Sequence, residues 1–232
     1  MRIKTLMLAA MVTLMTAAPL LAQESGGGPD ARGYVSGLGG FASSITNTTG
    51  DMQVEGGVRI APHVMWFGTI GRFANLQSDL QPTLDAATSA LAANQGIGVT
   101  GGGTLPAWYG VTGLRVEIPT STRFMPYVLG GVGLANLNPQ PTFSFASGTL
   151  PDGTTPAVGT DVTSVLTTPG VFTAPVSDTA LMFSLGGGVQ VSVASHWIVD
   201  AGYRYSRIAA DTTLSTTAQT TNGMTFGIGY RF

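Results

Sequence analysis

Charged side chains recur at alternating positions along this chain, and they are the first candidates for chemistry. They are Glu55, Arg59, Arg72, Arg115, Glu117, Asp200, Arg204 and Arg231. Successive side chains of a β-strand point to opposite faces, so this spacing would place all of them on one face. An unpaired charge in a narrow interior is costly, so the charges must pair or keep water. If the strands close into a small barrel, as argued below, this face is its interior. We then expect the charges to form a lumen polar cluster that acts as an ionic plug rather than a conducting path.

Two histidines, His63 and His196, are the candidates for acid–base catalysis. An enzyme on a barrel scaffold needs such a group beside a nucleophile or a carboxylate. Both histidines lie in short predicted turns, and neither has an obvious nucleophile in an alternating strand. We therefore predict no catalytic site, with a lipid-modifying hydrolase as a remote alternative because spatial neighbours are invisible in a sequence.

Composition excludes several other classes of site. Cysteine is absent, so the chain has no disulfide and no thiolate site. The loop acids Asp152, Asp161 and Asp178 are too far apart to form a recognised calcium loop. Beyond residue 22 the chain carries eight arginines and no lysine against twelve acids (8 − 12 = −4), so it lacks the basic footprint of a nucleic-acid-binding protein. No cofactor or metal is expected.

The first 22 residues read as a secretory signal peptide. Arg2 and Lys4 precede an apolar run from residue 6 to residue 22, which Pro19 interrupts and which is short for a membrane span. Ala22 is a plausible cleavage position, and residues 23–32 form a glycine-rich, flexible leader. No apolar run long enough for a transmembrane helix follows.

Eight segments of period-two alternation make up the rest of the chain. They span residues 34–42, 52–60, 64–73, 107–118, 126–134, 180–193, 197–206 and 223–232. Short connections at 61–63, 119–122 and 194–196 alternate with long ones at 43–51, 74–106, 136–179 and 208–222. In the third segment Phe67, Thr69, Gly71 and Phe73 are placed outside, which puts Arg72 inside; the facing of the first segment stays open. This pattern predicts an all-β fold over residues 33–232, an eight-stranded antiparallel up-and-down transmembrane β-barrel with short periplasmic turns and long external loops.

The two longest loops differ in their patterns. Leu80, Leu84, Ala87 and Leu91 have helical spacing, with Pro82 early and Gly96 after the end, so a short helix is expected on or near the barrel rim. Its leucine face should pack against the loop itself. The loop at 136–179 is rich in Thr, Pro, Gly and Ser and predicts neither a helix nor a repeat.

Two segments resemble a known family. Residues 223–232 end in alternating Phe226, Ile228, Tyr230 and Phe232, which resembles the closing strand of bacterial outer-membrane β-barrels. The run from Pro126 to Leu134 is similar to a segment of the small outer-membrane barrels of the OmpA and OmpX type. This resemblance implies insertion into the bacterial outer membrane, outer-membrane lipid around the wall, and a terminal signal read by the barrel-assembly machinery.

The direction of the alternation separates this chain from a soluble carrier. A lipocalin-like barrel is apolar inside and polar outside, whereas here the charges share the face opposite the continuous apolar one. We expect a non-enzymatic structural or surface-interaction protein that acts through external loops 74–106 and 136–179, with an unknown extracellular partner. The alternative is a narrow channel for small or apolar solutes, in which lumen glycines would leave space along one wall; their simpler role is to relieve crowding in a strongly curved barrel. These glycines are Gly131, Gly133, Gly186, Gly188, Gly227 and Gly229.

Overall fold

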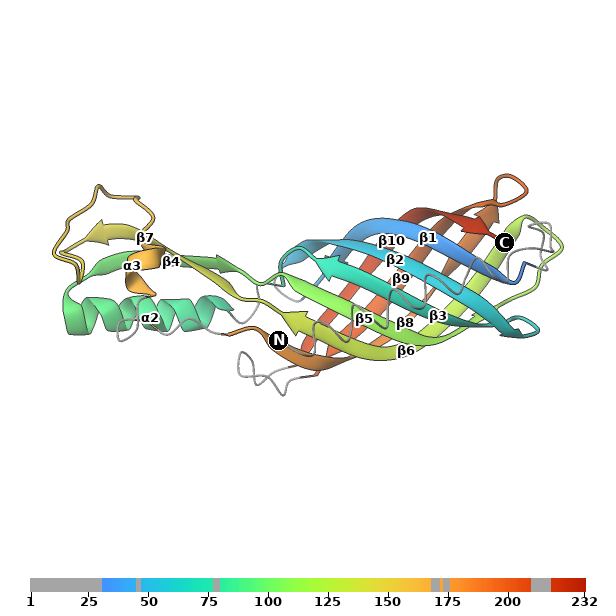
Figure 1. Cartoon of the computed structure of the whole chain (residues 1–232), viewed down its shortest axis with the longest axis horizontal. Coiled ribbons are helices and arrows are strands. Elements are labelled where there is room, and N and C mark those ends of the chain that lie inside the picture. The colour runs from blue at the N-terminus through green and yellow to red at the C-terminus, as the bar shows by residue number, and fades with distance from the viewer. Residues whose placement is uncertain (1–30, 45–46, 77–79, 168–171, 173–175, 210–217) are drawn as a thin grey trace.

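Eight antiparallel strands close into a barrel in the computed structural model, which describes residues 31–44, 47–76, 80–167, 172, 176–209 and 218–232 (Figure 1). The order around the wall is β1-β10-β9-β8-β6-β5-β3-β2. The strands are β1 (Gly33–Ser43), β2 (Thr48–Ala61), β3 (Val64–Phe73), β5 (Ala107–Glu117), β6 (Phe124–Leu137), β8 (Asp178–Ser192), β9 (Trp197–Ile208) and β10 (Gln219–Arg231). The last strand pairs with the first, with Tyr34 opposite Arg231, so the sheet has no open edge. The predicted all-β, eight-stranded antiparallel barrel is confirmed, while the expected signal peptide at 1–22 and most of the leader lie outside the described residues.

Large apolar side chains cover the outer wall. Leu185 is 62% exposed and Phe226 is 53% exposed, while their strand neighbours Ser184 and Thr225 are buried. The first strand, whose facing the sequence left open, turns Val35 and Phe41 outward and Tyr34 inward. The barrel thus has an apolar exterior and a mainly polar interior at mid-height, the pattern of a wall that faces lipid.

The facing predicted for the third strand is wrong. Phe67 and Phe73 are buried inside the barrel, and Arg72 is exposed on the outer wall. Both faces of this strand carry apolar residues, because Trp66 and Ile70 alternate with Phe67, so the sequence alone gave the two facings similar merit. Arg72 is one residue from the end of β3, where a long cationic side chain can extend beyond the apolar belt.

The connection between the first two strands is short. Ser43 pairs with Thr48, and the Ser44 N–H donates to the Asn47 carbonyl at 2.7 Å. The long loop predicted at 43–51 is therefore wrong, because β2 begins four residues earlier than its apolar alternation does. The short turns predicted at 61–63 and 194–196 lie at the opposite end, which we call the short-turn end; the other is the long-loop end.

The two longest loops fold together beyond the long-loop end (Figure 1). The first contains α2 (Leu80–Gln95) and β4 (Gly98–Thr104); the second contains β7 (Gln140–Ser147) and α3 (Thr163–Leu166). We call these four elements the distal module. The expected helix is confirmed, although it lies beyond the rim alongside β4, and the prediction that loop 136–179 has no helix is wrong. Among the described residues, no helix has both the length and the apolar character needed to cross a membrane.

The distal module has an apolar core of its own. Helix α2 contributes Leu84 and Leu91, so its leucine face packs within the loops as predicted. The two rings Phe143 and Phe172 meet edge to face at 5.1 Å. Gly101 allows the helix to approach, because a Cβ there would lie 2.9 Å from the Thr88 methyl group. The core consists of Leu84, Leu91, Ile97, Phe143, Phe145, Leu150, Val162 and Leu166.

One continuous two-stranded ribbon joins the module to the barrel. In β5 and β6 Ala107 lies opposite Leu137, and in β4 and β7 Thr104 lies opposite Gln140, which is the same register. Only Leu105-Pro106 and Asn138-Pro139 separate the two ladders, and the Asn138 N–H still donates to the Pro106 carbonyl at 3.0 Å. Proline lacks the N–H of a ladder bond, which explains the gap in both strands. The distal module therefore extends the barrel wall.

Candidate functional site

Glu55 is the centre of the lumen polar cluster. Its carboxylate accepts hydrogen bonds from the Tyr34 hydroxyl at 2.6 Å and the Thr69 hydroxyl at 2.9 Å. It also pairs with Arg204 at 2.5 Å and with Arg115 at 3.3 Å. These groups come from five strands, namely β1, β2, β3 and β5 on one side of the lumen and β9 across it. One carboxylate thus ties together side chains from more than half of the barrel's strands.

Arg115 is fully buried and lies between two aromatic rings. Its guanidinium carbon is 3.6 Å from the centroid of Tyr127 and 4.7 Å from that of Tyr34. Tyr127 donates to Asp200 at 2.8 Å, and Asp200 lies 3.9 Å from the Arg115 guanidinium. The buried cation therefore has carboxylates and ring faces around it, which offsets the cost of its removal from water.

Glu117 holds the cluster together at the short-turn end. Arg231 donates to its carboxylate at 2.9 Å and to the Gln190 amide oxygen at 2.6 Å. Arg59, the most exposed member with 22% of its side chain accessible, lies 3.7 Å from Glu117. Glu117 and Arg231 therefore meet across the lumen.

The cluster is balanced in charge. Arg59, Arg115, Arg204 and Arg231 face the lumen together with Asp51, Glu55, Glu117 and Asp200. Arg72 was predicted in this set and does not belong to it, because it lies on the outer wall with its guanidinium 5.6 Å from the centroid of Trp108. Four arginines against four acids leave no net charge, as a packed ionic core requires.

Several members were missed from the sequence. Asp51 accepts from the Tyr109 hydroxyl at 2.8 Å, and Gln53 accepts from Arg204 at 2.6 Å. Asp51, Gln53 and Glu55 have the same alternation, so the strand period could have revealed the first two. The lumen tyrosines were harder to find, because an aromatic residue is equally at home on the lipid face. They are Tyr34, Tyr109 and Tyr127.

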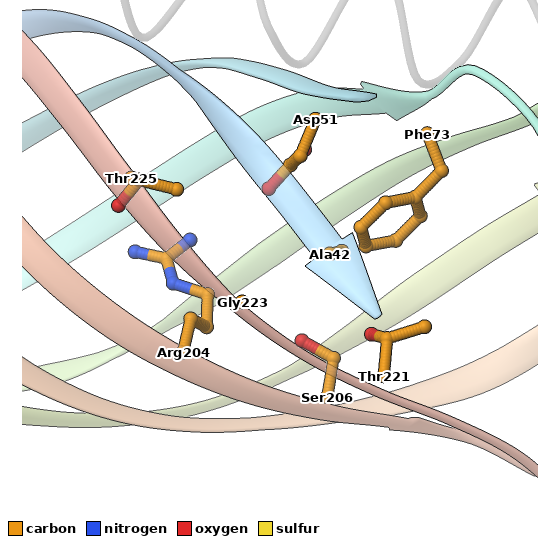
Figure 2. Close-up of a pocket in the computed structure, with 8 residues that line it drawn as sticks. All are labelled: Ala42, Asp51, Phe73, Arg204, Ser206, Thr221, Gly223 and Thr225. Atoms are coloured by element: carbon orange, nitrogen blue, oxygen red, sulfur yellow. The ribbon is translucent and has the colours of Figure 1, made fainter. Parts of the chain in front are cut away.

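Apolar side chains fill the lumen towards the long-loop end. Phe73 stacks on Tyr109 with ring centroids 4.7 Å apart. Phe73 therefore belongs to the lumen and not to the aromatic residues of the outer wall. A cavity of about 10 Å³ beside Asp51 and Arg204 has room for roughly one water molecule (Figure 2). Nearer the long-loop end, an apolar layer is made of Leu76, Leu105, Ala107, Leu137, Met182 and Ile208. The lumen thus has an ionic layer and an apolar layer, both packed.

The six lumen glycines allow close approach between neighbouring strands. A Cβ placed at any one of them would lie closer than 3.0 Å to an atom of an adjacent strand, for example the Thr112 carbonyl next to Gly131 and the Ala201 carbonyl next to Gly188. This geometry supports the simpler interpretation, relief of crowding in a tightly curved wall. It does not leave an open path along these strands.

The other predicted residues lie near the short-turn end or on the closing strand. The carbonyls of His63 and His196 accept from the N–H groups of Glu117 and Arg231, at 2.8 and 2.7 Å. The His196 ring stacks on Tyr230 at 5.3 Å. The assembly-signal residues Phe226, Ile228 and Tyr230 face outward, and the Phe232 carbonyl accepts from Arg32 and Gly33 at 2.8 and 3.0 Å. Within the described part of the chain, no group of three or more His, Asp or Glu side chains could hold a metal ion.

Structure comparison finds several solved proteins that are similar to this chain. Neisserial surface protein A has a similar structure, with a TM-score of 0.52 and 15% identity over 87% of this chain and 98% of that chain. Ail, the attachment invasion locus protein of Yersinia pestis, gives 0.43 and 13% over 86% and 97%, and the outer membrane enzyme PagL gives 0.38 and 10% over 84% and 97%. At these identities the likeness concerns the fold alone. No curated protein matches the sequence.

A family profile covers nearly the whole chain. The outer membrane protein beta-barrel domain matches residues 6–232. The closed eight-stranded barrel, its apolar outer wall and its closing strand are the features expected of that domain. The chain belongs to the outer membrane protein beta-barrel domain family.

Proposed function

We propose that this protein is a non-enzymatic surface protein of the bacterial outer membrane that presents the distal module outside the cell. The observation that carries the proposal is that loops 74–106 and 136–179 fold around one shared apolar core. The barrel then serves as an anchor, and the module serves as the interacting part.

The way the module is mounted supports this role. Here both loops contain helix and strand, and the ribbon joins them to β5 and β6 without a change of register. A partner would therefore meet a preformed surface, which lowers the entropy cost of binding.

The decisive experiment removes the module and keeps the barrel. Residues 77–104 and 140–176 are replaced together by short Gly-Asn turns, because both loops contribute side chains to the module core. Surface crosslinking on intact cells should give adducts that depend on the module, and these should vanish in the module-free barrel. Leu84→Asp, which puts a charge into the module core, should remove the same adducts without any change in chain length. Identical adducts from all three proteins, with the barrels folded, would eliminate the proposal.

The closing strand gives a separate test of location and assembly. Phe232 follows β10, and its carbonyl and N–H both bond to the start of β1. We propose that this end is read by the barrel-assembly machinery. Deletion of Phe232 should lower the amount of folded barrel in the outer-membrane fraction, whereas Val158→Ala, at an exposed position of the second long loop, should not. Normal insertion of the deletion variant would count against an assembly signal at this residue.

A further inference from the structure

Among the described residues of the barrel strands, the outer wall carries positive charge at the long-loop end and no matching negative charge. Arg72 is the next-to-last residue of β3, Arg207 is the next-to-last residue of β9, and both are exposed. Over the described residues of the eight barrel strands, four carboxylates are buried in the lumen: Asp51, Glu55, Glu117 and Asp200. The fifth, Asp178, is the first residue of β8 and shares the alternation of the buried Ala180 and Met182.

Arg72 sits where the outer wall changes from apolar to polar. Its register neighbours are Met52 on β2 and Trp108 on β5, and the Trp108 ring centroid lies 5.6 Å from the guanidinium carbon. One step further around the wall, the Asn136 amide donates to the Thr179 hydroxyl at 2.9 Å. Two residues back along each strand, towards the short-turn end, the outer wall is apolar at Val54, Ile70, Leu134 and Leu181.

We propose that Arg72 and Trp108 form a binding site for the phosphate group of lipid headgroups in the leaflet at the long-loop end. The guanidinium can donate two parallel hydrogen bonds to phosphate oxygens. The Trp108 ring, 57% exposed, holds the cation at the height of the membrane interface, where aromatic residues prefer to lie. Arg207 provides a second cationic contact elsewhere on the wall, beside Phe183 and Thr220.

The position of the site favours a lipid headgroup over free phosphate. The apolar wall below Arg72 is the surface that acyl chains cover, so their headgroups are held beside the guanidinium at high local concentration. A free anion would instead have to compete with water at an exposed side chain, where a single charge contact is weak. A zwitterionic headgroup carries its own ammonium group, which competes with the guanidinium for the phosphate and is repelled by it, so the site selects anionic over zwitterionic lipid.

The test uses Trp108 as a local reporter. With Trp66→Phe and Trp197→Phe, Trp108 is the remaining tryptophan of the mature chain. The protein is folded into vesicles of two kinds, both of which mix an anionic with a zwitterionic phospholipid. In the first kind the anionic lipid is brominated, and in the second kind the zwitterionic lipid is brominated. Bromine quenches the fluorescence of a nearby tryptophan. The quenching of Trp108 as a function of the brominated fraction, measured for each lipid, gives the affinity of its surroundings for anionic lipid relative to zwitterionic lipid. One arginine near the surface should give a preference of about fivefold.

Three matched variants decide the outcome. Arg72→Gln should bring the preference to about one, and Arg72→Lys should retain a smaller preference because an ammonium cannot make the bidentate contact. Arg123→Gln, at an exposed position near the short-turn end, should leave the preference unchanged. Retained heat-modifiable migration in gels shows that each variant is folded. An unaltered preference in Arg72→Gln would overturn the site, and loss of the wild-type preference on addition of inorganic phosphate at constant ionic strength would overturn its assignment to lipid.

Discussion

The barrel and the distal module are built on the same ribbon but place their polar residues on opposite sides. Along β5 and β6 the lumen face carries Arg115 and Tyr127 while the outer face carries Leu114 and Trp108. Beyond the prolines, the continuation of the lumen face carries the buried Phe143, and the outer face becomes polar. The exposed polar positions of that face are Thr100, Thr104, Asn138, Gln140, Thr142 and Ser144. The strand period does not change; what changes is the medium that each face meets.

This contrast predicts two regions that fail independently. The barrel depends on a closed ladder and a balanced ionic core, and no strand can leave without breaking the ring. The module depends on a small apolar core beside one helix. Variants can therefore separate the two, and the expected effects are described from the largest to the smallest.

Glu55→Ala should give the largest loss, and it should fall on the barrel alone. It leaves two buried arginines, Arg115 and Arg204, without their shared carboxylate. Removing one partner from a buried ion pair costs about 3–5 kcal/mol. Urea unfolding in lipid vesicles should show this loss, while protease resistance of the module stays unchanged. Glu55→Gln, which keeps the shape, should recover part of the stability; equal stability of Glu55→Ala and wild type would contradict a central role for this residue.

Leu84→Ala should destabilise the distal module and leave the barrel unchanged. Leu84 is fully buried in the module core, and a Leu→Ala change at such a site costs about 2–5 kcal/mol. The module should become sensitive to limited proteolysis between residues 80 and 104, and the barrel should keep its unfolding midpoint. Ser89→Ala, at an exposed position on the same helix, is the control. A lower barrel midpoint in Leu84→Ala would show that the two regions unfold as one unit.

Glu117→Ala should weaken the short-turn end without opening a pore. Its carboxylate is bonded to Arg231 and lies 3.7 Å from the partly exposed Arg59, so water can replace part of what is lost. A charge-assisted hydrogen bond contributes about 2 kcal/mol. The melting temperature in detergent should fall, and planar-bilayer recordings should show no stable channel. Large steady conductance from the unaltered protein would refute the ionic plug and support the channel alternative.

The smallest effect should be a local response of the module to acid. The hydroxyl and backbone N–H of Thr163 bond to Asp161 and hold the pKa of its carboxyl below the ordinary value; Thr154 does the same for Asp152. Because the folded pKa is lowered, this ordering is present above the ordinary Asp value of about 4 and is lost as the pH falls through the folded pKa. The protection factor of the Thr163 amide against hydrogen exchange should fall over that range. Asp161→Asn should flatten the response, and an unchanged protection factor in wild type would rule out the turn as its source.

The sequence predicted the barrel well because period-two alternation and a closing aromatic strand are local signals. It assigned eight charged residues to the lumen, and seven of them lie there. The exception is Arg72, because Phe67 and Ile70 make either facing of β3 acceptable. In the module the sequence predicted helix α2, but it did not predict the pairing of the two loops, for another reason. Pairing between β4 and β7 joins residues more than thirty positions apart, and the short runs involved, Gly-rich on one side and Thr- and Ser-rich on the other, have weak strand signals of their own.

The uninterrupted register of the ribbon also determines how far from the membrane this protein reaches. Ala107 is eight positions after Val99, and at about 3.4 Å per residue these eight steps span up to about 27 Å. A flexible tether of that length would sample many heights, whereas a paired ribbon favours one. If the module lies outside the cell as proposed, a surface polysaccharide layer thinner than this leaves the helix α2 uncovered, and a thicker one covers it. The thickness of the cell's own surface polymer would then decide when the module can be touched from outside.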